Sequence, residues 1–508
     1  MQTRQGDIGQ GSTGVFSSIQ ASGMQGQRAR SVRQLSQWRS VYLISVLCLL
    51  TGIASSAQTF TVLADFDKAT GYLPYSQALV QGFDGNFYGT TQTGGAHGSG
   101  TVFKLTPSGT VTAIYSFCAQ QHCADGANPG PGLVLNTDGN FYGSATNGGA
   151  YSHGTIFKIT PVGTLTTLHS FCQQTSCPDG RPPSAMVLAA DGNFYGTTDS
   201  RGAHNYYGGT IFKITPSGSL TTLYSFCALP KCADGREPNG LIQATDGNFY
   251  GTTLGDTVFK VTASGILTTL YTFCSQKVGT NCLDGSFPYA PLVQSAGGTF
   301  YGTTGVGGAN GYGTVFKITS SGTLTTLYSF CSQNNCTDGS DPQTALVQAT
   351  DGKLYGTTTG GGGYGNGTVF KITSGGTPTT LYSFCSQTNC TDGSEPNGLL
   401  QATNGNFYGT TISGGNSLDG VSFRLSAGLS PFVEALPTSG KVGAAIKILG
   451  TNLIGATSVS FNGTAATFTV VSKSEIKTTV PAGATTGRVM VDTPGGILKS
   501  NIVFRVRP

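Results

Sequence analysis

The chain contains, at residues 246–253, the sequence Asp-Gly-Asn-Phe-Tyr-Gly-Thr-Thr, and near-copies of this stretch follow one another along most of its length. The tyrosine of the stretch marks each copy and recurs at intervals of 51 to 55 residues. Self-similarity at a fixed period is the signature of a repeat architecture. The seven tyrosines are Tyr88, Tyr142, Tyr195, Tyr250, Tyr301, Tyr355 and Tyr408.

Each repeat unit carries four short apolar runs. In the unit around Tyr250 these runs cover residues 241–244, 248–253, 257–262 and 267–273. Runs rich in Val, Ile, Thr, Tyr and Phe, bounded by Gly, Asp and Pro, are typical of β-strands. The first and second runs are joined by residue pairs that suit a type I′ hairpin turn, so we expect antiparallel strands. These pairs are Asp84-Gly85, Asp138-Gly139, Asp191-Gly192, Asp246-Gly247, Gly297-Gly298, Asp351-Gly352 and Asn404-Gly405.

Four antiparallel strands per unit, repeated seven times, predict an all-β fold, a seven-bladed β-propeller. The two ends of the repeat region discriminate a closed propeller from an open solenoid. Residues 60–66 match the fourth strand of a unit, whereas the last unit ends after its third strand at residues 421–425. We therefore expect the amino-terminal strand to complete the seventh blade as its outermost strand, which removes an open sheet edge.

Twelve cysteines stand in pairs after the fourth strand of a unit, within the crossover to the next blade. Because each pair is local to its own loop, periodicity favours six short-range disulfides, and a zinc site is disfavoured because no His accompanies the pairs at ligand spacing. The expected pairs are Cys118–Cys123, Cys172–Cys177, Cys227–Cys232, Cys274–Cys282, Cys331–Cys336 and Cys385–Cys390.

Each cysteine pair leads into the motif Asp-Gly-x-x-Pro. The favoured interpretation is an Asx turn followed by a rigid crossover. The alternative is a ring of carboxylates that holds calcium or a polar ligand, although one aspartate per loop supplies few of the six to eight oxygens that calcium takes. The aspartates are Asp125, Asp179, Asp234, Asp284, Asp338 and Asp392.

Residues 1–57 are predicted to be a leader. Four arginines between Arg28 and Arg39 precede an apolar stretch at residues 41–53 and small residues up to Ala57, the pattern of a secretory signal peptide. Translation from Met1 and translation from Met24 both stay open. The 27 basic and 23 acidic residues give a net charge of +4, which the leader accounts for. We therefore expect export to the periplasm, outer surface or medium, with no nucleic-acid partner and no membrane association after cleavage.

Ligand-binding candidates lie in the loops between the second and third strands, because these loops vary while the frame is constant, and binding specificity usually resides in such loops. Tyr, His and Asn on glycine-rich supports suit contacts with sugars or peptides. No Ser-His-Asp set or carboxylate pair indicates catalysis, although His97, His153 and His204 in neighbouring blades leave a metal or acid–base role as the rival interpretation. The candidates are His97, Tyr151, His153, His204, Tyr206, Tyr207, Asn310, Tyr312, Tyr364 and Asn366.

The repeat, with its Asp-Gly-Asn-Phe-Tyr-Gly-Thr-Thr stretch followed by Gly-Thr-Val-Phe-Lys-Ile-Thr and Leu-Thr-Thr-Leu-Tyr-Ser-Phe, resembles the GloVer tandem repeat of exported bacterial "choice-of-anchor" proteins over residues 58–427. The resemblance implies export and a surface role and no activity. Residues 428–508 lack Cys and the 53-residue period. Their motifs, among them Phe461-Asn462-Gly463-Thr464 and Thr493-Pro494-Gly495-Gly496, are similar to an IPT/TIG domain, an Ig-like β-sandwich.

These observations lead us to expect an exported, non-enzymatic binding or adhesion protein, monomeric and without a cofactor, whose propeller loops recognise a glycan or a cell-surface partner. Two alternatives stay open. One is an enzyme acting on polysaccharide, which rests on fold-level analogy alone. The other is a purely structural scaffold of the cell envelope.

Overall fold

A computed structural model describes residues 58–74, 78–204 and 207–507 of the chain. The predicted signal peptide at 1–57 lies outside these residues. The described part is all-β, as predicted, with four short 3-10 turns and no α-helix. None of its helical segments has the length and apolar character needed to cross a membrane.

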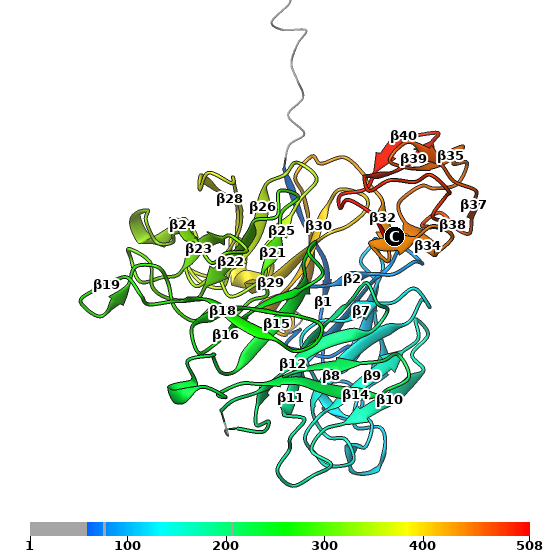
Figure 1. Ribbon diagram of the computed structural model, residues 1–508. Coiled ribbons are helices and arrows are strands. Elements are labelled where there is room, and N and C mark those ends of the chain that lie inside the picture. Colours follow the sequence, from blue (N-terminus) through cyan, green and yellow to red (C-terminus); the bar gives the residue numbers. More distant parts are fainter. Residues whose placement is uncertain (1–57, 75–77, 205–206, 508) are drawn as a thin grey trace, which may run out of the picture. The chain divides into compact units, whose positions relative to one another are not determined.

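The propeller strands run blade by blade along the chain (Figure 1). They are β1 (Thr59–Asp65); β2 (Val80–Gln81), β3 (Phe87–Thr91), β4 (Thr101–Leu105) and β5 (Val111–Ser116); β6 (Ala127–Pro129), β7 (Val134–Leu135), β8 (Phe141–Asn147), β9 (Thr155–Ile159) and β10 (Leu165–Ser170); β11 (Arg181–Leu188), β12 (Phe194–Ser200), β13 (Thr210–Ile214) and β14 (Leu220–Ser225); β15 (Pro238–Gln243), β16 (Phe249–Thr253), β17 (Thr257–Val261) and β18 (Leu267–Thr272); β21 (Val293–Gln294), β22 (Phe300–Thr304), β23 (Thr314–Ile318) and β24 (Leu324–Ser329); β25 (Val347–Gln348), β26 (Leu354–Thr358), β27 (Thr368–Ile372) and β28 (Pro378–Ser383); and β29 (Ser394–Gln401), β30 (Phe407–Ser413) and β31 (Val421–Ser426).

Within the described residues these strands form seven antiparallel sheets, each ordered from first to fourth strand, and in the second blade the first strand is split into β6 and β7. The seventh sheet has the order β29-β30-β31-β1. There β1 pairs antiparallel with β31, with Val62 opposite Phe423 and a bulge between Val62 and Ala64. The predicted pairing of the amino-terminal strand with the last repeat is confirmed.

Within the described residues, contacts between aromatic rings join neighbouring blades at six of the seven seams. Tyr88 of the first blade packs on Phe141 of the second with ring centroids 4.2 Å apart. The same contact closes the series, because Tyr408 of the seventh blade packs on Phe87 of the first at 4.1 Å. In each repeat, the phenylalanine packs on the tyrosine of the preceding blade, and the tyrosine packs on the phenylalanine of the next blade. The exception is the sixth blade, where Leu354 stands in the place of the phenylalanine. The stacked rings are almost completely buried and supply the cores between blades.

The Asp-Gly hairpins form, but the predicted type I′ geometry is wrong, because only the glycine of each pair has positive φ, as at Gly85 (80°) and Gly247 (85°). Gly85 N–H instead donates to the carbonyl of Gly82 at 2.9 Å, so a turn centred on Phe83 and Asp84 is followed by a left-handed glycine. The turn aspartate also fixes the tyrosine of the repeat. In the fourth blade, Tyr250 donates a hydrogen bond to Asp246 at 2.9 Å, and Lys260 of the third strand lies 3.4 Å from the same carboxylate. The lysine on the third strand therefore neutralises the turn aspartate.

Residues 434–507 form separate sheets of short strands, as the Ig-like prediction requires. Ser474 of this domain donates to the carbonyl of Phe83, and Asn501 donates to the carbonyl of Gln348, at 2.7 and 3.0 Å. Both acceptors adjoin Asp-Gly turns of the propeller. The strands are β32 (Glu434–Leu436), β33 (Ser439–Lys441), β34 (Ala445–Leu449), β35 (Ser458–Phe461), β36 (Thr464–Ala465), β37 (Phe468–Val470), β38 (Glu475–Thr479), β39 (Val489–Thr493), β40 (Gly496–Lys499) and β41 (Arg505–Arg507).

The crossovers contain the disulfides. Twelve cysteines of the described residues form six bonds in the pairs predicted from the sequence. Four of the crossovers also form a 3-10 turn that ends at the second cysteine, and the crossover after β18 forms a small hairpin. These elements are η1 (Gln121–Cys123), η2 (Pro230–Cys232), η3 (Asn334–Cys336), η4 (Thr388–Cys390), β19 (Lys277–Val278) and β20 (Asn281–Cys282).

Candidate functional site: the loop face

The loops between second and third strands lie against the disulfide crossovers, and together they form what we call the loop face. Backbone hydrogen bonds join the two sets of loops in successive blades. Gly149 donates to the carbonyl of Cys123 at 2.9 Å, and Gly362 donates to that of Cys336 at 2.8 Å. The loop face is opposite the turn face, which consists of the Asp-Gly turns and the third-to-fourth turns, because loops of a four-stranded meander alternate between its two ends.

The aspartate of each Asp-Gly-x-x-Pro motif is committed to its own crossover. Asp234 is fully buried and accepts hydrogen bonds from the hydroxyl of Tyr224 (2.8 Å) and from the backbone N–H groups of Ala228 and Leu229 (3.0 and 3.2 Å). Asp125, Asp284, Asp338 and Asp392 have equivalent partners. The predicted Asx turn is wrong for these motifs, because each carboxylate accepts from N–H groups that precede it in the crossover and not from the residue two positions after it. These hydrogen bonds occupy the carboxylate oxygens that the calcium alternative would need.

Several sequence-predicted candidates lie exposed at the tips of the loop face. The tyrosines present their rings to solvent, with exposed fractions of 41% for Tyr151, 56% for Tyr207, 47% for Tyr312 and 58% for Tyr364. His97 and His204 are exposed as well. Tyr206 falls outside the described residues.

The two asparagine candidates are engaged in local hydrogen bonds. Asn310 donates to the carbonyl of Phe330 at 3.0 Å, and Asn366 donates to that of Tyr364 at 2.9 Å. Their side chains therefore shape the loops as well as facing solvent. Whether any of the ten candidates binds a ligand stays a prediction.

His153 is a candidate whose side chain contacts residues of the neighbouring crossover. Its Nδ1 lies 2.7 Å from Nη1 of Arg181, and since a guanidinium can only donate, the imidazole nitrogen accepts. Burial is the main cause that lowers the pKa of His153, and the positive charges of Arg181 and Arg201 lower it further. A neutral imidazole follows, held between the loop of the second blade and the crossover into the third.

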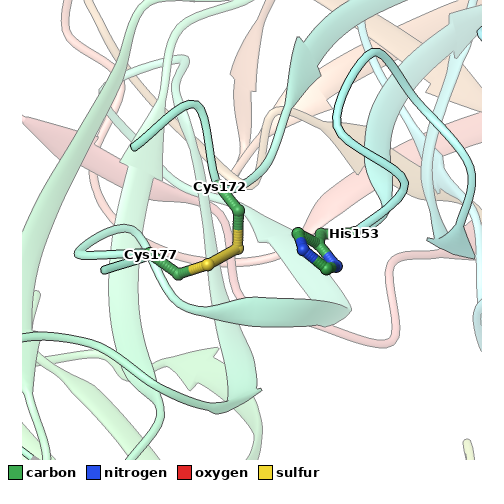
Figure 2. Close-up of side chains that lie close together, drawn as sticks. All are labelled: His153, Cys172 and Cys177. Carbon is green, nitrogen blue, oxygen red and sulfur yellow. A yellow bond between two sulfur atoms is a disulfide. The ribbon is translucent and has the colours of Figure 1, made fainter. Parts of the chain in front are cut away.

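His153 also lies beside the disulfide Cys172–Cys177, as Figure 2 shows. The two sulfur atoms and an imidazole nitrogen lie within 4.8 Å of one another. This is the spacing of metal ligands, but cysteine binds metals as a thiolate and both sulfurs are here in a disulfide. At 6% and 4% exposure, Cys172 and Cys177 are buried, whereas the cysteines of the other crossovers are partly exposed.

The rival acid–base interpretation asked whether His97, His153 and His204 act together. Within the described residues, no hydrogen bond joins any of the three to another, and each belongs to a different loop. The structure therefore assembles no histidine pair on this face.

The sequence reasoning missed a second set of variable residues, which precede the proline of each crossover motif. Members of this set adopt a positive φ that side chains rarely take, for example 55° at Glu237, 55° at Phe287 and 57° at Asp341. Their backbone bridges neighbouring blades, since Asp341 N–H donates to the carbonyl of Tyr312 at 3.0 Å. The signal was available, because this position varies inside a constant frame. The set is Asn128, Glu237, Phe287, Asp341 and Glu395.

Among curated proteins, no sequence matches this chain. Among solved structures, a fungal alcohol oxidase of the AA5 family in complex with copper matches with 13% sequence identity and a TM-score of 0.49, over 87% of this chain and 98% of that one. The extracellular domain of a protein described as a hybrid two-component system of B. thetaiotaomicron matches with 10% identity and a TM-score of 0.46, over 89% and 60% of the two chains. The WD40 β-propeller domain of Doa1 matches with 10% identity and a TM-score of 0.43, over 72% and 97%.

Family models match both regions of the chain. The IPT/TIG domain matches residues 431–506, in agreement with the sandwich of short strands. The Gloeobacter/Verrucomicrobia repeat matches twice, at residues 118–283 and 229–423, and these matches together span more than half of the 508 residues. The chain therefore belongs to the Gloeobacter/Verrucomicrobia repeat family and carries an IPT/TIG domain behind its repeats.

Proposed function

We propose that this protein is an exported, non-enzymatic binding protein whose loop face recognises a glycan or a partner on a cell surface. The observation that carries the proposal is the contrast between a constant frame and varied loop tips. The tips present Tyr151, Tyr312 and Tyr364 with exposed rings, and a ring with a polar edge suits stacking on a sugar. Disulfides in the crossovers are consistent with an oxidising, extracytoplasmic environment.

The turn face is less suited to this role. Its turn aspartates are neutralised by lysines of the same blade, as Lys213 neutralises Asp191 at 2.9 Å. Part of it also contacts the IPT/TIG domain through Phe83 and Gln348. These contacts favour the loop face as the surface that meets a ligand.

A glycan array tests the proposal directly. The purified protein from residue 58 onward should be retained by at least one glycan class, and the triple variant Tyr151→Ala, Tyr312→Ala, Tyr364→Ala should lose that retention. A matched control is Val162→Ala, since Val162 is highly exposed on a third-to-fourth turn of the turn face.

Two results would contradict the proposal. One is folded protein that is retained by no glycan and captures no cell-surface partner. The other is retention that survives the triple variant but fails in Val162→Ala. Release of new reducing ends from a bound polysaccharide would instead support an enzyme.

A further inference from the structure

The seam between the second and third blades differs from the other seams of the loop face in its charge. His153 comes from the loop of the second blade, Arg181 from the crossover into the third, and Arg201 from the loop of the third. We call these three residues the seam cluster. Both arginines lie near enough to His153 for their charges to lower its pKa.

Within the described residues Arg181 has no carboxylate partner, whereas Lys104, Lys158, Lys213 and Lys260 each pair with a turn aspartate. Its buried Nε has no hydrogen-bond partner among the described residues. Its Nη1 donates to Nδ1 of His153. Asp179 nearby is occupied, because its carboxylate lies 3.1 Å from the imidazole of His169 and accepts from the N–H of Cys172.

The next crossover shows what the repeat does with an arginine at this position. Arg236 follows Asp234-Gly235 as Arg181 follows Asp179-Gly180, so the two arginines are equivalent in the repeat. Arg236 is paired with its neighbour Glu237 at 3.7 Å. In the seam cluster, Pro182 takes the place of that glutamate. The charge of Asp179 also acts on His153, against those of Arg181 and Arg201, so two positive charges face one negative charge there.

Aromatic residues belong to the same two loops as His153 and Arg201. Tyr151 stands two residues before His153 in the same loop, and Tyr207 lies in the loop that contains Arg201. Both rings are widely exposed. A planar guanidinium matches a carboxylate, which it can bind through two parallel N–H donors, and an exposed ring offers a stacking surface for a sugar.

From this arrangement we propose that the seam cluster is a subsite for the carboxylate of an acidic glycan, with Arg181 as its main cationic contact and Tyr151 against the sugar ring. The inference rests on the proposed glycan-binding function and narrows it to polysaccharides that contain uronic acids. The neutral imidazole of His153 positions Arg181 and leaves its positive charge in place for the ligand.

Isothermal titration with three polysaccharides tests the subsite. Polygalacturonate supplies carboxylates, dextran sulfate supplies sulfates, and dextran is neutral. We expect the protein to bind polygalacturonate in preference to the other two. Arg181→Gln should weaken this binding by about tenfold or more, the loss expected when one charge-assisted contact is removed. Arg236→Gln, the repeat-equivalent control that removes the same charge, should change it less than about twofold.

Because Arg181 is partly buried, two further variants keep the test valid if Arg181→Gln unfolds. Arg201→Gln and Tyr151→Ala lie on loops and should each weaken binding to polygalacturonate. Because the Tyr151 ring is exposed, the thermal unfolding midpoint of Tyr151→Ala should stay unchanged. Equal binding of dextran and polygalacturonate, unaffected by these variants, would overturn the subsite and leave the proposed function standing. Preference for dextran sulfate would overturn the carboxylate assignment. Folded protein that binds no polysaccharide or surface partner at all would overturn the proposed function itself.

Discussion

Tyrosine and aspartate form a polar pair in five of the described crossovers, and His169 takes the place of the tyrosine in the crossover that contains Asp179. A buried carboxylate is costly unless hydrogen bonds satisfy it. In the fourth strand of the third blade, the hydroxyl of Tyr224 satisfies one oxygen of Asp234, and loop N–H groups satisfy the rest. The pairing also holds the tyrosine hydroxyl protonated, because burial and the hydrogen bond to Asp234 raise the pKa of Tyr224.

Replacing Tyr224 with Phe should lower the free energy of unfolding by about 1–3 kcal/mol, because one donor to a buried carboxylate is lost. Urea unfolding followed by fluorescence measures this change. Tyr151→Phe is the matched control, since Tyr151 is exposed, and its stability should stay within about 0.5 kcal/mol of the parent. Equal stabilities of all three proteins would show that the carboxylate does not need the hydroxyl.

Glu434, at the start of the IPT/TIG domain, is expected to make the stability of the protein depend on pH. Burial raises its pKa from 4.5 to about 7. A raised folded pKa means that its contribution to stability is fully present below about pH 4.5 and is lost as pH rises through about 7. Glu434→Gln should remove this loss, so its unfolding midpoint should exceed that of the parent at pH 8 and match it at pH 4. A difference that grows toward acid pH would contradict the assignment.

At the scale of elements, the loops that lead from one blade to the next are closed in two ways, by a disulfide or by hydrogen bonds. Six crossovers within the described residues use a disulfide. The segment from the amino-terminal strand into the first blade has no cysteine. There the carboxylate of Asp67 accepts from the N–H and hydroxyl of Thr70, at 2.7 and 2.8 Å. Hydrogen bonds across four residues thus close a loop that elsewhere is closed covalently.

Replacing Cys331 and Cys336 together with Ser should therefore give a folded protein that is less stable by about 2 kcal/mol, the chain-entropy value for so short a loop. Denaturant titration with and without a dithiol reductant measures the effect. With reductant, the parent should be less stable than the variant measured without reductant, because the reductant opens all six disulfides of the parent. A variant that fails to fold would show that the disulfide has a role beyond constraining the unfolded chain.

For the whole molecule, the strand pairing between β1 and β31 joins the ends of the propeller. Phe60 of β1 stacks on Tyr382 of the sixth blade with ring centroids 3.6 Å apart, and it also contacts Phe384 and Phe423. The amino-terminal strand therefore buries its aromatic ring between two blades as well as completing one sheet.

Deletion of residues 58–66 should leave β31 as an unpaired sheet edge, which promotes association of chains. We expect oligomers in light scattering and a lower unfolding midpoint than that of the parent. A peptide of residues 58–66 should restore a monomer and raise the midpoint, whereas a scrambled peptide should do neither. A deletion variant that stays monomeric with an unchanged midpoint would contradict the structural role of β1.

Repetition explains which features the sequence could predict. Comparison of one repeat unit with the next predicts the hairpins at the Asp-Gly pairs, the local disulfides and the closing strand. The prediction is strong because the same pattern occurs in seven copies. The contact between His153 and Arg181 could not be found this way. It joins residues 28 positions apart across a seam, and it exists where the pattern is broken by Pro182. The Tyr–Asp pairs were missed for a related reason, since the sequence gives no direction for a side chain at the end of a strand.

The seventh blade can be completed only after nearly the whole repeat region has been synthesised. β1 is the first propeller strand to be synthesised, and the partner of its Thr61, Arg424, lies 363 residues later. Before residues 421–426 have been synthesised, β1 has no β31 with which to pair. A chain that ends early or is cut within the repeats therefore leaves both the apolar strand β1 and a sheet edge unpaired, and these two features are absent when β1 and β31 are paired.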